Sequence, residues 1–162
     1  MLPIEIVLSK DTAILVPILH EAEEDDARIL RAIEDPSNTA YLAQSEDNLV
    51  GAIVMQWAPA KSEILYIATQ PAWRGRGYGK TIMNWIIDEA QRQGTAEIWV
   101  GTANAALDNI AFYQKCGFRM DSIRKDFFDY FSDPVYENGI RIQDMVMLKL
   151  VVAEVIENTT HS

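Results

Sequence analysis

The segment "AWRGRGYGKT" (72–81) has the composition of a loop that binds phosphate. Glycines alternate with larger residues, cations lie among them, and a helical pattern follows directly. Closely spaced glycines let backbone N–H groups approach an anion, and the positive end of a helix dipole favours negative charge. Arg74 stands where a Walker loop needs its first glycine, and Lys80 where a dinucleotide loop needs its third. A pyrophosphate therefore fits this loop well, and the alternative is a glycine-rich turn without a ligand.

The elements around the loop predict one mixed α/β domain. A β-α-β crossover runs from the strand at 62–69 to the strand at 96–102, which implies a parallel pair beside an antiparallel hairpin. We expect a mixed sheet with helices on its faces, a single domain over 1–157 and a disordered tail over 158–162. Strands are predicted at 4–8, 40–45, 48–58, 62–69, 96–102, 118–124 and 141–152, and helices at 12–20, 25–34, 79–94 and 107–118.

Composition and charge exclude several classes of function. The formal net charge of −10 argues against nucleic acid as a partner, because phosphate backbones require a basic surface. No apolar run approaches the ~20 residues that span a membrane, and the N-terminus lacks the basic start of a signal peptide. The single cysteine, Cys116, cannot form an internal disulfide. We therefore expect a cytoplasmic protein that binds neither nucleic acid nor membrane. No cluster has metal-ligand spacing, so no metal is expected.

Two motifs resemble those of a known family. The stretch Arg74-Gly75-Arg76-Gly77-Tyr78-Gly79 matches the [QR]-x-x-G-x-[GA] motif of the GNAT superfamily of acetyl-CoA-dependent N-acyltransferases. The stretch "NIAFYQKCGF" (109–118) is similar to the family's second signature, at the expected spacing. The resemblance is most specific over 48–120, whereas the first 45 residues agree in element order only. It implies the GNAT fold, with a mixed sheet that splays at its centre, and acetyl-CoA as the co-substrate.

The resemblance also implies where coenzyme A binds. Its pyrophosphate would bind backbone N–H groups of 75–80, and its pantetheine arm would pair with the end of the 62–69 strand. The family often has an asparagine seven residues before the tyrosine of the second signature, and here that residue is Ala106. Asn104 and Asn109 lie nearby, and either is a candidate substitute for that contact, although neither stands at the motif position. The alternative role of Asn104 is a helix cap. The expected coenzyme-binding residues are Ile67, Ala68, Thr69, Arg74, Gly75, Arg76, Gly77, Tyr78, Gly79, Lys80 and Asn104.

Acyl transfer to an amine requires a neutral amine, donors for the developing oxyanion and a proton for the leaving thiolate. By resemblance, Tyr113 supplies that proton; the alternative is a core aromatic residue. Glu63 begins the 62–69 strand, where histone-type members carry the glutamate that deprotonates the amine. The alternative is that Glu63 is an exposed glutamate at a strand end, and that the amine is deprotonated through water.

The acceptor side of this fold is expected near the first two helices and the segment between the last strands. Both regions are acidic, at 21–26 and at 126–137. Such runs are either a solvated surface or a field that attracts a cation. We expect the acceptor to be a cationic primary amine: a small polyamine-like or amino-sugar compound, or a lysine or N-terminal amine of a protein. Trp57 and Trp73 are candidates for the acceptor pocket or for the core.

Other functions and the assembly stay open at this point. His20 is expected at the surface rather than in catalysis. A homodimer is one expected assembly. An acyl-CoA-binding module without turnover is the main alternative function. A P-loop phosphotransferase is a third reading, against which Arg74 argues.

Overall fold

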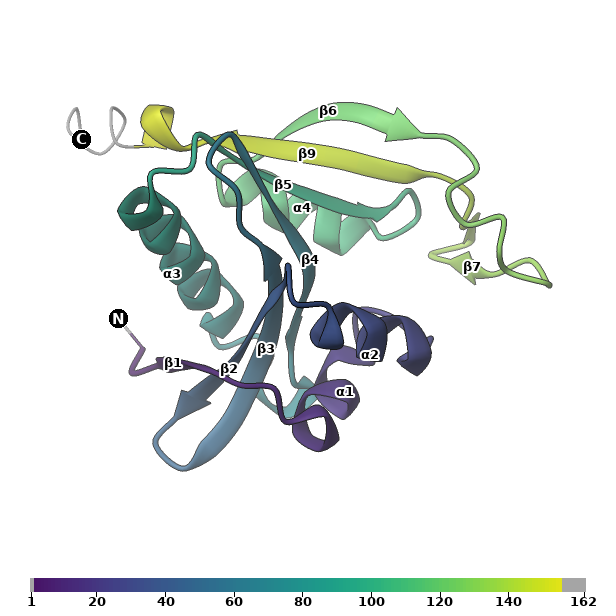
Figure 1. Ribbon diagram of the computed structural model, residues 1–162. Helices are drawn as coiled ribbons and strands as arrows, with labels where there is room; N and C mark the ends of the chain where they lie inside the picture. The colour runs from purple at the N-terminus through teal and green to yellow at the C-terminus, as the bar shows by residue number, and fades with distance from the viewer. Residues whose placement is uncertain (1, 156–162) are drawn as a thin grey trace. The chain divides into compact units, whose positions relative to one another are not determined.

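The computed structural model describes residues 2–155 (Figure 1). Packing divides the described residues into two compact units, the first ending at Thr95 and the second beginning at Ala96. Each unit has its own antiparallel strands and its own helices. The tail predicted over 158–162 lies outside the described residues, and the single domain over 1–157 stays a prediction. No helix within residues 2–155 is long and apolar enough to cross a bilayer.

The first unit contains an antiparallel meander of β1 to β4, in which each strand pairs with the next. Its strands are β1 (Glu5–Leu8), β2 (Thr39–Ser45), β3 (Asn48–Gln56) and β4 (Lys61–Thr69). The turn between β2 and β3 is tight, with Glu46 at a φ of 56°. Most residues of β2 and β3 are apolar and buried, so the side chains of these strands are covered on both faces of the meander.

Helices cover both faces of this meander (Figure 1). On one face lie α1 (Thr12–Leu19) and α2 (Asp26–Glu34), whose buried residues include Leu15 and Ile29 and pack with alternate residues of the strands such as Val54. On the other face lies α3 (Tyr78–Gln93), with the buried side chains Ile82, Met83, Ile86, Ile87 and Ala90. The helix ends at Gly94, which has a φ of 75° and closes α3 in a left-handed cap.

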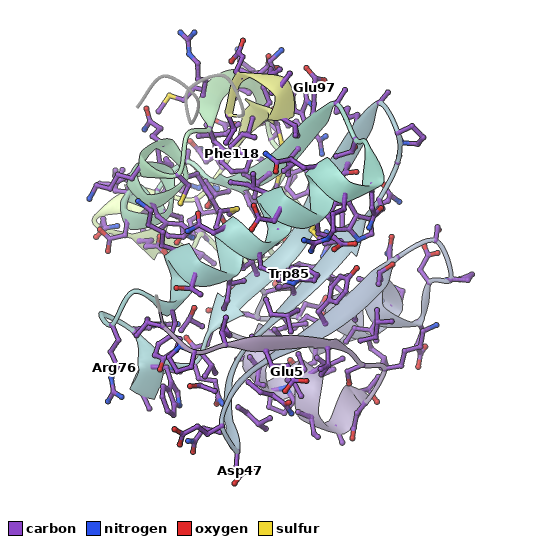
Figure 2. All side chains as sticks on the ribbon, turned by 90° about the vertical axis from the view of Figure 1, so that its left-hand side faces the viewer. Glu5, Asp47, Arg76, Trp85, Glu97 and Phe118 are labelled. Atoms are coloured by element: carbon purple, nitrogen blue, oxygen red, sulfur yellow. The ribbon has the colours of Figure 1, made fainter. Side chains whose placement is uncertain are left out.

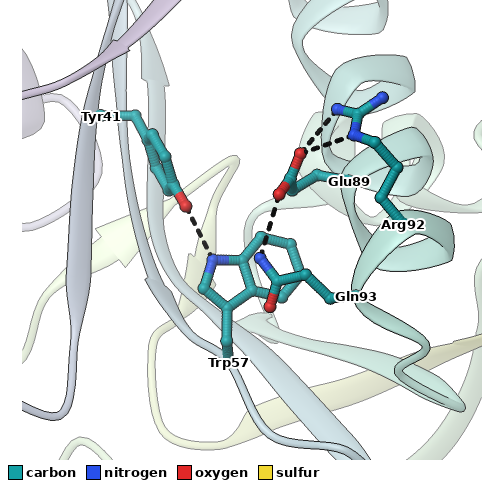
Figure 3. Close-up of polar contacts among 5 residues, drawn as sticks. All are labelled: Tyr41, Trp57, Glu89, Arg92 and Gln93. Atoms are coloured by element: carbon teal, nitrogen blue, oxygen red, sulfur yellow. Dashed lines mark hydrogen bonds and ion pairs between the residues drawn. The ribbon is translucent and has the colours of Figure 1, made fainter.

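The α3 face also carries an aromatic group. Tyr41 of β2 meets the Trp85 ring edge-on, with a centroid distance of 4.9 Å. The Trp57 indole N–H donates to the Tyr41 hydroxyl at 2.9 Å (Figure 3). Figure 3 also shows Glu89 held by Arg92 and Gln93 one turn further along α3. Trp57 therefore belongs to the packing of this unit.

The second unit is built on a three-stranded antiparallel arrangement with β9 between its neighbours. Its strands are β5 (Glu97–Ala103), β6 (Arg119–Arg124) and β9 (Met145–Val151), and its helix is α4 (Leu107–Lys115). A small hairpin of β7 (Tyr136–Glu137) and β8 (Ile140–Arg141) lies between β6 and β9 along the chain. Asn138 and Gly139 form its turn, both with positive φ.

The predicted order of elements is confirmed, with corrections at several boundaries. The predicted helix at 107–118 ends at Lys115, and Gly117 follows with a φ of 105°. The strand predicted at 141–152 begins at Met145, because residues 140–141 pair with β7 instead. The strand predicted at 48–58 ends at Gln56, and a short 3-10 helix, η1 (Pro71–Trp73), precedes the glycine loop.

Candidate active site

The glycine loop connects the end of β4 to the start of α3, as the sequence predicts. Gly75 and Gly77 have φ values of 73° and 87°, in the left-handed region that favours glycine. Gly77 is the N-cap of α3 and has no side chain, so no cap hydrogen bond satisfies the first N–H groups of the helix. A Cβ at Gly75 would have no neighbour within 4 Å, and one at Gly77 only a Leu2 methyl at 3.5 Å. The backbone conformation, not packing, thus requires glycine here.

Arg74 holds the loop against the rest of the first unit. Its Nη2 lies 2.8 Å from Oε2 of Glu21, and its Nε donates to the Thr69 carbonyl at 3.2 Å. The side chain thereby ties the loop to the end of β4 and to the α1–α2 connection. Its guanidinium is therefore engaged within the protein, and its predicted contact with coenzyme A stays a prediction.

The other two cations of the loop are exposed. The Arg76 guanidinium lies 5.2 Å from the centroid of the Trp73 ring and extends outward from the loop (Figure 2). Trp73 in turn packs edge-on against Tyr78, which is buried. Lys80 makes no hydrogen bond or ion pair with any residue of the described part of the chain. The loop thus offers two exposed cations beside the free N–H groups of α3, an arrangement that suits a pyrophosphate.

A bulge in β4 separates Glu63 from the segment predicted to pair with pantetheine. Ile67, Ala68 and Thr69 pair with Ile53, Ala52 and Gly51 of β3. The register then shifts, so that Tyr66 opposes Val54 and Ile64 opposes Met55, with Leu65 as the extra residue.

The bulge changes the face on which Glu63 lies. Simple alternation would put Glu63 on the same face as Ile67 and Thr69. Its actual partner is Gln56, two residues after Val54, and Val54 belongs to the core beneath α1 and α2. Glu63 is half-buried on that face. Its role as the base stays a prediction.

Tyr113 is buried on α4 with its ring between Phe112 and Phe118, at centroid distances of 5.5 and 5.9 Å. Burial raises the pKa of Tyr113 well above its ordinary value, and the nearby Cys116 adds to that rise. The phenol therefore keeps its proton at neutral pH. No residue in 2–155 forms a hydrogen bond with its hydroxyl. Such a phenol can donate a proton or a hydrogen bond to a ligand.

Asn104 is committed to the segment between β8 and β9. Its Oδ1 accepts the N–H groups of Gln143 and Asp144 at 2.9 and 3.1 Å, and its Nδ2 donates to the Arg141 carbonyl at 3.0 Å. It does not cap α4, whose N-cap is Ala106 without a side-chain bond. The amide of Asn104 thus already forms three hydrogen bonds within the second unit. Its contact with coenzyme A stays a prediction.

The acidic run 21–26 is largely paired within the first unit. Glu21 pairs with Arg74 and Glu23 with Arg28, while Asp25 caps α2 by accepting the Ala27 N–H. The remaining pair is Asp26 with the exposed His20, whose Nδ1 lies 2.8 Å from the carboxylate. This hydrogen bond is the main reason that the pKa of His20 is raised. The run is thus mainly structural, and its field on a distant cation is weakened.

One feature of the second unit was missed in the sequence. The β7–β8 hairpin was not predicted, although Asn-Gly between short extended segments is a strong hairpin signal. The aromatic residues that precede it form a cluster of ring contacts, whose members are Phe127, Phe128, Tyr130 and Phe131. Within residues 2–155, no three His, Cys, Asp or Glu side chains gather as a metal site would need.

Comparison with known proteins assigns these features to one family. The acetyltransferase (GNAT) family profile matches residues 9–118. The chain is 33% identical over 144 residues to the uncharacterized N-acetyltransferase YvbK of Bacillus subtilis, covering 82% of this chain and 93% of that protein. A GNAT family acetyltransferase from Elizabethkingia anophelis, solved with acetyl-CoA bound, has a TM-score of 0.83 at 30% identity, covering 91% of this chain and 97% of that one. A shorter match, 31% over 70 residues, is to the ribosomal protein bS18-alanine N-acetyltransferase of Escherichia coli, covering 42% of this chain and 46% of that one.

Proposed function

This chain belongs to the acetyltransferase (GNAT) family and is an acetyl-CoA-dependent N-acetyltransferase; from that premise, we propose that it acetylates a cationic primary amine by direct attack on the thioester. The neutral amine nitrogen attacks the acetyl carbonyl, and the C–S bond breaks as the amide forms. One proton leaves the amine and one is added to the departing thiolate. Each of these transfers needs a group in this chain.

The buried phenol of Tyr113 is the observation that carries the proposal. A thiolate that leaves at neutral pH needs a proton donor, and the phenol of Tyr113 is protonated at neutral pH, since its pKa lies at or above the ordinary value of about 10. The hydroxyl has no competing partner within residues 2–155. We assign Tyr113 the role of general acid, and Glu63, directly or through water, the role of base.

The glycine loop is our proposed site for the pyrophosphate of coenzyme A. The left-handed conformations of Gly75 and Gly77 support this. So does the absence of a side chain at the N-cap, Gly77, which leaves the first N–H groups of α3 without a side-chain cap. Arg76 and Lys80 would add charge, and Arg74 would hold the loop in place. The backbone of Ile67, Ala68 and Thr69 would pair with the pantetheine arm.

The cationic acceptor is supported by the charge of the chain. The net charge is −10, and the carboxylates of Asp129 and Asp133 are exposed. The bS18-alanine N-acetyltransferase, to which part of the chain is similar, acts on an alanine of a protein, so an N-terminal amine is among the candidates. Polyamines, amino sugars and lysine side chains complete the panel.

A free-thiol release assay with acetyl-CoA tests the proposal. Tyr113→Phe keeps the ring between Phe112 and Phe118 but removes the hydroxyl. We expect kcat to fall by about 10²-fold, as for loss of a general acid, with the KM for acetyl-CoA unchanged. Tyr41→Phe removes a buried hydroxyl that bonds Trp57 and is the matched control, with kcat unchanged. An unchanged kcat in Tyr113→Phe would exclude the assigned acid, and no release with any amine would exclude the proposed acceptor class.

A further inference from the structure

A small pocket of about 90 Å³ opens in the second unit. Its residues belong to the segment between β6 and β9, which Figure 1 shows with the label β7. The residues that line the pocket include Phe128 and Phe131 and the charged Asp129, Asp133 and Arg141. All of these residues follow β6 and precede β9 along the chain. The function assigned above to the loop and to Tyr113 does not use this pocket.

The rings of the pocket suit a cation. Phe128 and Phe131 are stacked, with a centroid distance of 5.7 Å and an interplanar angle of 20°. Tyr130 meets Phe131 edge-on at 4.8 Å and holds that ring in place. The face of an aromatic ring is negative and attracts a cation within about 6 Å of its centroid. Both phenylalanines are half-buried, so part of each ring stays accessible.

The charges of the pocket are available, unlike those of the run 21–26. Asp129 and Asp133 are exposed, and neither forms an ion pair with any residue in 2–155. Arg141 forms none there either, so the charged residues of the lining, two aspartates and one arginine, do not neutralise one another by direct pairing. The lining has a net negative charge. The lining is therefore complementary to an ammonium group. The alternative is a ligand with a carboxylate, which would pair with Arg141.

Hydrogen bonds fix the walls of the pocket before any ligand arrives. Asn104 holds the backbone of Arg141, Gln143 and Asp144, as described above. The Asn138 amide donates to the Ala105 carbonyl at 3.0 Å and fixes the hairpin turn. A preformed site does not pay the entropy of ordering its walls when it binds.

We propose that this pocket binds an alkylammonium group, and, resting on the proposed function, that this group is the second, non-reacting amine of the acceptor. The ring faces of Phe128 and Phe131 contact the ammonium, and Asp129 and Asp133 balance its charge. The acceptor is then a diamine or a longer polyamine, rather than a monoamine. The protein distinguishes a diamine from a monoamine by the second charge of the diamine, because the chemistry at the reacting amine is the same for both substrates.

The test compares acceptors that differ only at the far end: 1,5-diaminopentane, n-pentylamine and 5-aminopentanoate. We expect the wild-type kcat/KM for the diamine to exceed that for the monoamine by about tenfold, and the ratio to fall to about one in the double variant Asp129→Asn, Asp133→Asn. Phe131→Leu, which keeps an apolar side chain but removes the ring, should lower the ratio as well. The matched control is Asp47→Asn with Glu154→Gln, which makes the same change of net charge at exposed positions outside the pocket; Asp47 lies at the β2–β3 turn (Figure 2).

A ratio unchanged in the pocket variants, or changed equally in the control, would overturn the inference. A preference for 5-aminopentanoate would also overturn it, in favour of a carboxylate on Arg141. Direct binding separates this inference from the proposed function. Pentyltrimethylammonium cannot be acetylated, and its binding is measured by ligand-observed NMR on the full chain. If no amine is acetylated but the probe binds and loses about tenfold in affinity in Asp129→Asn, Asp133→Asn alone, the proposed acceptor class fails while the pocket stands.

Discussion

Substitution of Gly77 by alanine tests the phosphate loop without removing any side-chain contact. The residue has a φ of 87°, where an L-residue costs about 1–2 kcal/mol. The added Cβ would meet only a Leu2 methyl at 3.5 Å, an ordinary van der Waals distance, so no clash adds to this cost. For a chain of 162 residues we expect Tm to fall by about 2–8 °C.

The larger effect should be on coenzyme binding. If the loop relaxes to relieve the strain, the N–H groups at the start of α3 turn away from the pyrophosphate. A hydrogen bond to a charged group contributes about 1.5–3 kcal/mol, so loss of one weakens acetyl-CoA binding by about ten- to a hundredfold. Isothermal titration calorimetry with acetyl-CoA measures this directly, and a thermal melt without ligand gives the stability.

The other end of the same helix provides the matched control. Gly94 also has a positive φ, 75°, and a Cβ there would meet nothing within 4 Å. Gly94→Ala should therefore lower Tm by a similar amount and leave acetyl-CoA affinity unchanged. The assignment of the loop would be refuted if Gly77→Ala bound acetyl-CoA as tightly as the wild type, or if Gly94→Ala weakened binding as much.

Three further perturbations test the contacts around the site. Asn104→Ala removes hydrogen bonds to three backbone groups and should lower the free energy of unfolding by about 2–3 kcal/mol in a denaturant titration. Asn109→Ala loses one hydrogen bond of 3.4 Å and should lower the free energy of unfolding by much less. Glu21→Gln breaks the exposed ion pair with Arg74 and should raise the KM for acetyl-CoA by at most about fivefold. Glu24 makes no ion pair within the described chain, so Glu24→Gln should leave the KM for acetyl-CoA unchanged. Asp26→Asn should return the pKa of His20 toward its ordinary value in an NMR titration. Because the pKa of His20 is raised in the folded state, the contribution of the His20–Asp26 pair to folding stability is complete below the ordinary pKa of histidine. That contribution is lost as the pH rises through the raised pKa of the folded state.

The parts of the site that depend on local sequence could be predicted. The loop between β4 and α3 follows from alternate glycines before a helical pattern, and the structure places Gly75 and Gly77 in the left-handed conformations that such a loop uses. The burial of Tyr113 follows from its place in an apolar helix pattern beside Phe112. The Asn138-Gly139 turn carried an equally local signal that the sequence analysis did not use.

The parts that depend on distant residues could not be predicted. Period-two alternation puts Glu63 on the face of Ile67, and only the pairing with β3 reveals the extra residue that moves it to the other face. Asn104 forms its bonds with residues about forty positions further along the chain. Nothing in the residue type distinguishes this role from a helix cap or a ligand contact, because an asparagine amide suits all three.

The distribution of acid shows why net charge alone does not define a substrate. Both runs, 21–26 and 126–137, are acidic in sequence, but the carboxylates of the first are used by Arg74, Arg28, His20 and the cap of α2. A paired carboxylate presents little field beyond a Debye length of ~8 Å, so this run contributes to the geometry of the loop more than to the choice of acceptor. Asp129 and Asp133 lack such pairs within residues 2–155 and line the same pocket as Phe128 and Phe131. Selectivity for a cation should therefore follow these two residues, although they carry only a small part of the total charge.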